Sequence, residues 1–219
     1  MIRLITLLIV VLLFLSGCSD TMQVMDGCYI NPNKNISEIG RVAIVELAND
    51  SGYPQISTDL TDALYQSLQK KQLFSLNIIR QNDPAWQSLQ LDLDSTYTLE
   101  QLFAIRKTLK RDAILIGTVT KYTPYPHMAI GLRVRLVDLK DGELIWGVER
   151  IWDCSDKVTE YQIENYYKRQ IRSGFAPLRE QLAIMSQRKF LEFITYETAE
   201  TLRPRTWNNQ PITIVLKKR

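Results

Sequence analysis

Cys18 is the residue of this 219-residue sequence whose surroundings most clearly point to chemistry. It follows Ser16 and Gly17, which come directly after an apolar run of 12 residues at positions 4–15. A basic start, an apolar stretch and small residues form a secretory signal, whereas a bilayer-spanning helix needs about 20 apolar residues. A thiolate is a good nucleophile, so Cys18 is a suitable site for covalent modification. We therefore predict a signal peptide over residues 1–17.

The segment Leu15-Ser16-Gly17-Cys18 resembles the lipobox of bacterial lipoproteins, in which the signal is cut before a cysteine that carries a lipid. This resemblance implies that Cys18 bears a diacylglyceryl group and anchors the chain to a membrane. Ser19 is similar to the residue found in lipoproteins sorted to the outer membrane. The resemblance therefore predicts a lipid-anchored protein on the periplasmic face of a bacterial outer membrane, with an ordinary secreted protein as the alternative.

Two further cysteines, Cys28 and Cys154, complete the three in the chain. An exported chain meets an oxidising compartment, where thiols tend to pair. A disulfide between Cys28 and Cys154 would fasten the N-terminal segment to the folded core. The alternative is two free cysteines, one of them buried.

Patterns for catalysis and metal binding are weak. His127 is the only histidine, and it stands in a proline-rich connection where an exposed loop residue is the simplest interpretation. The carboxylate pairs Asp92/Asp94 and Asp153/Asp156 are of a kind that is common on protein surfaces. No phosphate-binding loop, nucleophile elbow or zinc-protease motif is present in the sequence. We predict a protein that is not an enzyme and has no catalytic residue, metal site or cofactor.

Tyrosines flanked by prolines indicate a contact surface. Tyr122 and Tyr125 stand beside Pro124 and Pro126, and rigid aromatic side chains suit contacts with a protein or a glycan. Packing of these rings over the end of a sheet is the alternative. Tyr53 stands in a turn after the first predicted strand, at the edge where α/β sheets often bind ligands. We therefore predict partner binding by Tyr122, Tyr125 and His127, together with Tyr53.

Positive charge is concentrated in the C-terminal section. Residues 157–219 contain 12 Lys+Arg and 6 Asp+Glu, a net charge of +6, whereas residues 18–156 contain 14 Lys+Arg and 18 Asp+Glu, a net charge of −4. A basic section suits an acidic protein, an anionic headgroup or a cell-wall polymer, and a solvated helix face explains it equally well. Nucleic acid is excluded as a partner if the chain is exported.

Hydrophobic periodicity predicts strands interleaved with helices. Apolar or alternating runs indicate strands at residues 42–47, 74–79, 113–119, 132–136 and 144–152, with a short candidate at 212–216. Helical spacing indicates helices near residues 57–71, 98–109 and 158–202, the last interrupted at 173–177. Ser57 or Thr58 is predicted to cap the first helix, and Thr98 with Gln101 the second.

The resulting order, β-α-β-α-β-β-β-α, predicts an α/β fold in which helices pack on a mixed sheet. The Asp-Gly pair at residues 141–142 predicts a hairpin turn. The polar residues 18–40 are interpreted as a lipidated tether, so that structure would begin at Arg41. Residues 41–156 then form the α/β domain, and residues 157–219 form a basic helical section packed on the same domain.

Three segments are similar to the superfamily of CsgG-like lipoproteins. They are residues 41–45 (RVAIV), residues 113–119 (AILIGTV) and, the most distinctive, residues 134–146 (VRLVDLKDGELIW). The superfamily includes the curli-secretion lipoprotein, a peptidoglycan-synthase activator, polysaccharide-export ring lipoproteins and the N-terminal domain of TolB. The resemblance, which covers residues 41–155, implies that Asp138 caps the turn, that Gly142 belongs to it and that Trp146 packs in the core.

The same resemblance implies the class of function. Members of this superfamily bind partners or form rings in the cell envelope, so it predicts a non-enzymatic protein of secretion, polysaccharide export or cell-wall synthesis. Its partner would be an envelope protein or a cell-wall polymer. The alternatives are a homo-oligomeric ring subunit of an export apparatus and an envelope enzyme that acts on glycan.

Overall fold

The computed structural model describes residues 27–89, 97–170 and 186–202, all within the unit Asp26–Trp207. The strands are β1 (Cys28–Ile30), β2 (Arg41–Val45), β3 (Ala48–Asn49), β4 (Ser75–Ile79), β5 (Ala113–Thr123), β6 (Ala129–Asp138) and β7 (Leu144–Asp153). The helices are the 3-10 helix η1 (Ile36–Glu38), α2 (Gln55–Gln69), α3 (Pro84–Gln87), α4 (Leu99–Leu109), α5 (Lys157–Gln170) and α7 (Gln187–Thr201).

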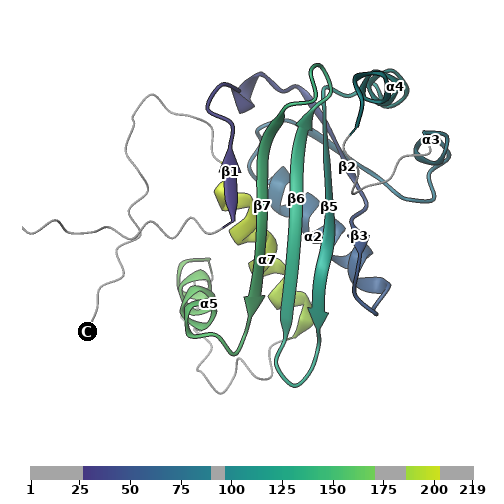
Figure 1. Cartoon of the computed structure of the whole chain (residues 1–219). Coiled ribbons are helices and arrows are strands. Elements are labelled where there is room, and N and C mark those ends of the chain that lie inside the picture. Colours follow the sequence, from purple (N-terminus) through teal and green to yellow (C-terminus); the bar gives the residue numbers. More distant parts are fainter. Residues whose placement is uncertain (1–26, 90–96, 171–185, 203–219) are drawn as a thin grey trace, which may run out of the picture. The chain divides into compact units, whose positions relative to one another are not determined.

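The strands form one mixed sheet (Figure 1). Its order is β1-β7-β6-β5-β2-β4, and the two-residue strand β3 pairs with β5. β2 is parallel to β4 and β5, as expected where the connections contain helices, whereas β5, β6, β7 and β1 are antiparallel neighbours. The predicted α/β fold with a mixed sheet packed by helices is therefore confirmed.

Helices cover both faces of this sheet. On one face, α2, α5 and α7 share a core with the strands, and Leu64, Trp146 and Phe193 are fully buried in it. On the other face, α3 and α4 bury Trp86 and Ile105 against β2 and β5. Figure 1 shows α2 and α7 crossing behind β5–β7. Each fully buried side chain of this size stabilises the fold by about 1.5–3 kcal/mol. Because such side chains hold helices on both faces of the sheet, the two cores fix the ends of the strands relative to each other.

The turn between β6 and β7 has the geometry that the sequence predicted. The N–H of Lys140 donates to the Asp138 carboxylate at 2.8 Å, and the N–H of Gly142 donates to the Asp138 carbonyl at 2.9 Å. Gly142 has a φ of +79°, a left-handed conformation that favours glycine. Trp146 is completely buried, and its ring N–H donates to the Thr201 hydroxyl at 3.0 Å. The predicted roles of Asp138, Gly142 and Trp146 are confirmed.

The N-terminal segment joins the sheet earlier than the sequence suggested. β1 lies on the outer edge of β7 and covers N–H and C=O groups that an edge strand would otherwise leave unpaired. Beyond β1, Lys34 forms ion pairs with Asp138, at 2.8 Å, and with Asp141. The expectation that structure begins at Arg41 is therefore wrong. Of the predicted tether, the part from residue 27 onward is already attached to the sheet.

The C-terminal helices belong to the same core as the strands. Tyr166 of α5 packs against Phe193 and Tyr196 of α7, with ring centroids 5.8 Å and 4.8 Å apart. α7 also lies along α2, where Lys71 pairs with Glu200. The interruption predicted at 173–177 and the strand predicted at 212–216 lie outside the described residues.

Candidate functional site

The three tyrosines predicted to bind a partner lie at the end of β5 or in the turn next to it. Tyr53 and Tyr122 stand 69 positions apart in the sequence, yet their ring centroids are 5.1 Å apart and their planes meet at 86°. This edge-to-face arrangement is a favourable one for aromatic rings. Tyr125 follows on the connection from β5 to β6. We call Tyr53, Tyr122 and Tyr125, with the loop 124–127, the aromatic corner.

Hydrogen bonds within the turn after β3 position Tyr53. The side-chain amide of Asn49 donates to the Tyr53 carbonyl at 2.8 Å, and the Asn49 side-chain oxygen accepts from the N–H of Ser51 at 2.9 Å. The N–H of Asp50 donates to the Val119 carbonyl of β5 at 3.0 Å. The turn is therefore fastened to the strand that carries Tyr122, and this is why the two rings meet.

Tyr122 lies near the end of β5, after an irregularity between Val119 and Lys121. Its ring is half-buried against the core of the sheet. Burial raises the pKa of the Tyr122 phenol, and the neighbouring Tyr53 and the negative charge of Asp59 raise it further. The phenol of Tyr122 is therefore neutral at physiological pH.

Tyr125 and His127 project from the loop between β5 and β6. Tyr125 is 84% exposed, Tyr53 is 48% exposed, and His127 is exposed as well. A ring this exposed contributes little to the stability of the fold, but it offers a large apolar area to a binding partner. The structure therefore places all four residues predicted to bind a partner at the end of β5 or in the turn next to it.

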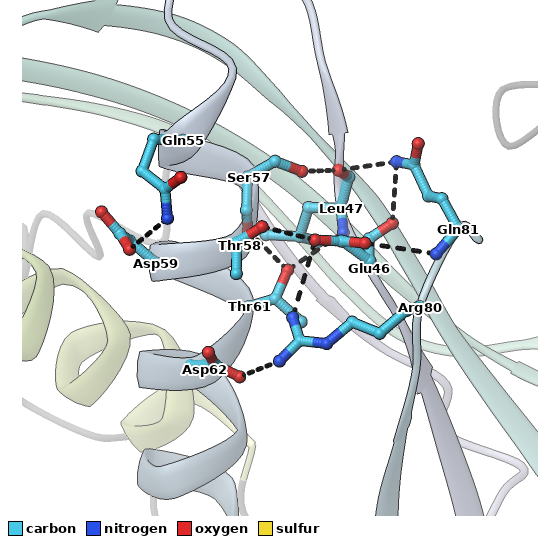
Figure 2. Close-up of polar contacts among 10 residues, drawn as sticks. All are labelled: Glu46, Leu47, Gln55, Ser57, Thr58, Asp59, Thr61, Asp62, Arg80 and Gln81. Atoms are coloured by element: carbon cyan, nitrogen blue, oxygen red, sulfur yellow. Dashed lines mark hydrogen bonds and ion pairs between the residues drawn. The ribbon is translucent and has the colours of Figure 1, made fainter. Parts of the chain in front are cut away.

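A carboxylate lies beside these rings. Asp59 of α2 accepts hydrogen bonds from the side-chain amides of Gln55, at 3.2 Å, and of Gln187 on α7, at 3.3 Å. Figure 2 shows the Gln55–Asp59 pair on the first turns of α2. The aromatic corner thus has an acidic and amide-rich border.

A second polar group, which the sequence did not predict, lies where β2 and β4 end (Figure 2). The Glu46 carboxylate accepts from the Thr58 hydroxyl at 2.6 Å and from the N–H of Gln81 at 3.2 Å. Arg80 Nη1 lies 3.6 Å from Glu46, and Arg80 Nη2 donates to Asp62 at 2.6 Å. We call these five residues, together with Leu47, Ser57 and Thr61, the clamp.

The backbone of Leu47 is the centre of the clamp. Its N–H donates to the Thr61 hydroxyl at 3.1 Å, and its carbonyl accepts from the Ser57 hydroxyl and from the Gln81 side chain. Leu47 and Thr61 have no exposed surface. The clamp therefore joins the end of β2 to the first half of α2 through buried hydrogen bonds, and the end of β4 joins it through part-buried and exposed bonds of Arg80 and Gln81.

The clamp explains why the predicted helix cap is wrong. α2 begins at Gln55 with Pro54 before it, so Ser57 and Thr58 lie inside the first turns. Their hydroxyls bond to Leu47 and Glu46 instead of the helix backbone. By contrast, Thr98 and Gln101 form the predicted capping box at the start of α4, so that prediction is confirmed.

The clamp occupies the carboxyl ends of parallel strands, where α/β sheets commonly bind ligands. Here the Glu46 and Leu47 groups are bonded to other residues of the clamp. Next to the clamp, the aromatic corner exposes the rings of Tyr53 and Tyr125 and offers few strong ligands. Its chemistry suits recognition by packing.

Of the two alternatives for Cys28 and Cys154, a disulfide or two free cysteines, the structure has the second. Cys28 lies opposite Val148 in the β1–β7 register, whereas Cys154 follows the end of β7. The six residue steps from Val148 to Cys154 extend roughly 20 Å along a strand. A disulfide requires α-carbons less than about 7 Å apart, so the two thiols cannot meet.

The covalent and metal chemistry of the chain is limited in the described parts. Cys18 and the pair Asp92/Asp94 lie outside them. Within residues 27–89, 97–170 and 186–202, no group of three or more His, Cys, Asp or Glu side chains could hold a metal ion. Over the same ranges, no helix is both long enough and apolar enough to cross a membrane.

No family model matches the sequence, and a search of curated proteins finds no match either. Among solved structures, the PelC dodecamer from Paraburkholderia phytofirmans is 13% identical, with 82% of this chain and 96% of that chain covered and a TM-score of 0.48. Lipoprotein GNA1162 from Neisseria meningitidis is 13% identical over 61% of this chain and 98% of that one, with a TM-score of 0.40. The C-terminal domain of LpoB from Escherichia coli is 23% identical over 52% and 82%, with a TM-score of 0.38. At these values the similarity assigns neither a family nor a function to this chain.

Proposed function

We propose that this chain is a lipid-anchored protein of the bacterial envelope that works by binding a partner protein through the aromatic corner. The observation that carries the proposal is the meeting of Tyr53 and Tyr122 at 5.1 Å beside the exposed Tyr125. The signal at residues 1–17 and the lipobox-like segment before Cys18 support the anchor. The resemblance to CsgG-like lipoproteins supports a place in an envelope assembly on the periplasmic face of the outer membrane.

The aromatic corner has the properties of a binding hot spot. Tyrosine is enriched in hot spots because it buries a large area with little loss of conformational freedom. The turn that carries Tyr53 is fastened to β5, so its position is set before a partner arrives. Asp59 and the side-chain amides of Gln55 and Gln187 add hydrogen-bonding groups at the border.

Catalysis is the weaker candidate for this surface. His127 is exposed, and Asp153, a carboxylate close enough to feel its charge, has a pKa that is lowered mainly by hydrogen bonds from Ser155. A general base needs a substrate group held within hydrogen-bond distance, and the corner offers no enclosed site built around His127. Replacement of His127 by glutamine keeps a polar side chain for contacts but removes the titratable ring, so it is expected to leave function in the cell unchanged. A loss of function with an intact fold and an unchanged affinity for the partner would revive the enzyme alternative.

The binding test uses a photoreactive amino acid placed at position 125 in cells, with the same amino acid at Lys70 as the matched control. Both positions are exposed, but Lys70 lies at the end of α2 away from the corner. We expect one discrete cross-linked protein from position 125 and none from position 70. Cross-links that are equal from both sites would contradict the proposal.

The affinity for the identified partner then measures how much the aromatic corner contributes to binding. Tyr125→Ser is expected to weaken binding by about 30-fold, the loss of about 2 kcal/mol that is typical of a hot-spot tyrosine. Exposed Tyr161 of α5, replaced in the same way, is the control and should leave the affinity unchanged. Binding to isolated cell wall, lost in Tyr125→Ser, would instead identify a polymer as the partner.

Two measurements address the anchor and the assembly. Metabolic labelling with a clickable fatty acid should mark the wild-type chain and leave Cys18→Ser unmarked. Light scattering on the purified chain without its lipid gives its mass. A discrete multimer would support a ring subunit of an export apparatus, and a monomer would favour one-to-one binding of the partner.

A further inference from the structure

One side of α4 combines exposed apolar residues with positive charge. Leu99 and Phe103 are each 68% exposed, although they are large apolar side chains. At 3.6 residues per turn, these two and the exposed Arg106 and Lys107 fall within an arc of about 100°, and the exposed Lys110 caps the end of the helix directly after them. We call these five residues the α4 flank.

The α4 flank differs from the rest of the helix. Leu102, Ile105 and Leu109 face the core and are buried, so they hold α4 on the sheet. The one acidic residue of the helix, Glu100, lies about 20° beyond the edge of the arc of the flank, so three cations outnumber one carboxylate on this side. The flank is therefore an apolar and basic strip held in a fixed position.

The chain between the predicted lipid and the sheet is short. Ten residue steps separate Cys18 from Cys28, the first residue of β1, and they span at most roughly 35 Å when fully extended. α4 packs over β2 and β5, and β2 lies four strand intervals from β1, or roughly 19 Å. A bilayer surface that holds the lipid of Cys18 is therefore within reach of α4.

We propose that the α4 flank rests on the anionic phospholipid surface to which Cys18 is anchored, an inference that depends on the lipid anchor of the proposed function. Leu99 and Phe103 enter the boundary between headgroups and acyl chains, as apolar residues of interfacial helices do. Arg106, Lys107 and Lys110 lie near the lipid phosphates, which complement their charge. A protein partner on this flank is the competing occupant.

This orientation has a consequence for the aromatic corner. The buried residues of α4 share a core cluster with Ile114 and Ile116 near the start of β5, whereas Tyr122 stands near its end. The eight residue steps from Ile114 to Tyr122 extend roughly 25 Å along the strand. Contact of the α4 flank with the membrane leaves the corner at the far end of β5, open to a partner in the periplasm.

The test uses the full lipidated chain, purified from membranes and incorporated into vesicles. A fluorescent label is attached to Ala104→Cys, an exposed position on α4 outside the flank, or to Gln66→Cys on α2, on the opposite face of the sheet. Burial raises the pKa of the native Cys28 and Cys154 thiols, so an introduced surface thiol reacts selectively. Lipids with a quencher on the headgroup then report how close each label lies to the membrane.

In vesicles of phosphatidylcholine and phosphatidylglycerol, we expect the label at position 104 to be quenched severalfold more than the label at position 66. The charge reversal Lys107→Glu/Lys110→Glu should remove the difference. The matched control Lys70→Glu/Lys157→Glu, which changes the net charge equally at exposed positions elsewhere, should keep it. Vesicles of phosphatidylcholine alone should show a smaller difference than the anionic vesicles.

Three results would overturn the inference. Equal quenching at positions 104 and 66 in anionic vesicles, with the chain floating with the vesicles, would leave the anchor intact and show that α4 does not touch the membrane. A difference that survives the charge reversal would remove the role of the phosphates. A chain that does not float with either kind of vesicle would refute the lipid anchor and this inference together.

Discussion

The clamp and the aromatic corner lie at neighbouring strand ends of one sheet, and they leave their side chains in opposite states. In the clamp, the polar groups of Glu46 and Leu47 are bonded to side chains of α2 and to residues after β4. In the corner, Tyr125 and His127 project into solvent. One region therefore uses its side chains to stabilise the fold, whereas the other leaves them exposed, as the proposed binding requires. The predictions below test that division.

The largest effect on stability is expected in the clamp. Thr61→Val keeps the shape of the side chain but removes the hydroxyl that accepts from the buried N–H of Leu47. A buried donor without a partner costs about 1–3 kcal/mol in the free energy of unfolding. Urea denaturation followed by circular dichroism measures the loss, and partner affinity should not change.

The matched control for this substitution is Thr108→Val on the exposed side of α4. We expect its free energy of unfolding to stay within about 0.5 kcal/mol of the wild-type value. If Thr61→Val were as stable as Thr108→Val, the clamp would not contribute to stability in the way that its contacts indicate.

A smaller loss in the free energy of unfolding is expected for Tyr53, where the aromatic corner packs against the fold. Tyr53→Ala removes the edge-to-face contact with Tyr122 and should lower the free energy of unfolding by about 1 kcal/mol. Tyr125→Ser, which removes a ring that is 84% exposed, should change it by less than about 0.5 kcal/mol. Both variants should lose partner affinity. A fold that is destabilised more by Tyr125→Ser than by Tyr53→Ala would contradict this view of the corner.

Much of the framework is predictable from sequence because it depends on short-range contacts. The capping box of Thr98 and Gln101 spans three residues, and the Asp138–Gly142 turn is set by its own backbone and carboxylate. The alternation of β6 and β7 reflects one face that is buried in the core. These signals are local, so they predicted the α/β order and the hairpin.

The elements that escaped prediction depend on partners far away in the chain. β1 has only three residues and gains its hydrogen bonds from β7, more than one hundred positions later, so no local pattern indicates it. The clamp was missed because Ser57 and Thr58 look like helix caps until Leu47 and Glu46 are placed beside them. Each tyrosine of the corner was predicted to be a contact residue, but the meeting of Tyr53 with Tyr122 follows from the β3–β5 pairing.

The electrostatics of the corner provide a test with a small expected effect. Burial, the Tyr53 ring and the charge of Asp59 raise the pKa of Tyr122, so the folded state favours the neutral phenol. The stability linked to this group is therefore fully present below the unfolded-state pKa of about 10 and is lost as the pH rises above it. Asp59→Asn should lower the pKa of Tyr122, because it removes a negative charge, while the effect of burial remains.

Tyrosinate absorbance during alkaline titration measures this change, and the difference from a Tyr122→Phe variant isolates the one phenol. Glu38→Gln, which removes an equal charge from an exposed position on η1, is the control and should leave the titration unchanged. If the pKa of Tyr122 were the same in Asp59→Asn as in the wild type, the Asp59 carboxylate would lie too far from the phenol to affect its titration. Asp59 would then not belong to the border of the aromatic corner.

The smallest expected change concerns the thiol at the base of the corner. The N–H of Cys154 donates to the carbonyl of Met128 at 2.9 Å, directly after the loop that carries Tyr125. Burial, with a smaller contribution from the charge of Asp153, raises the pKa of the Cys154 thiol to about 12. Since the thiolate is the reactive form, Cys154 in a Cys28→Ser background should not react with a thiol reagent at pH 8 and should react fully in denaturant. Tyr125→Ser should leave this protection unchanged, because the Tyr125 ring is 84% exposed and contributes little to packing. Rapid labelling in that variant would mean that the loop depends on Tyr125 for its position, and the separation between binding and stability would not hold there.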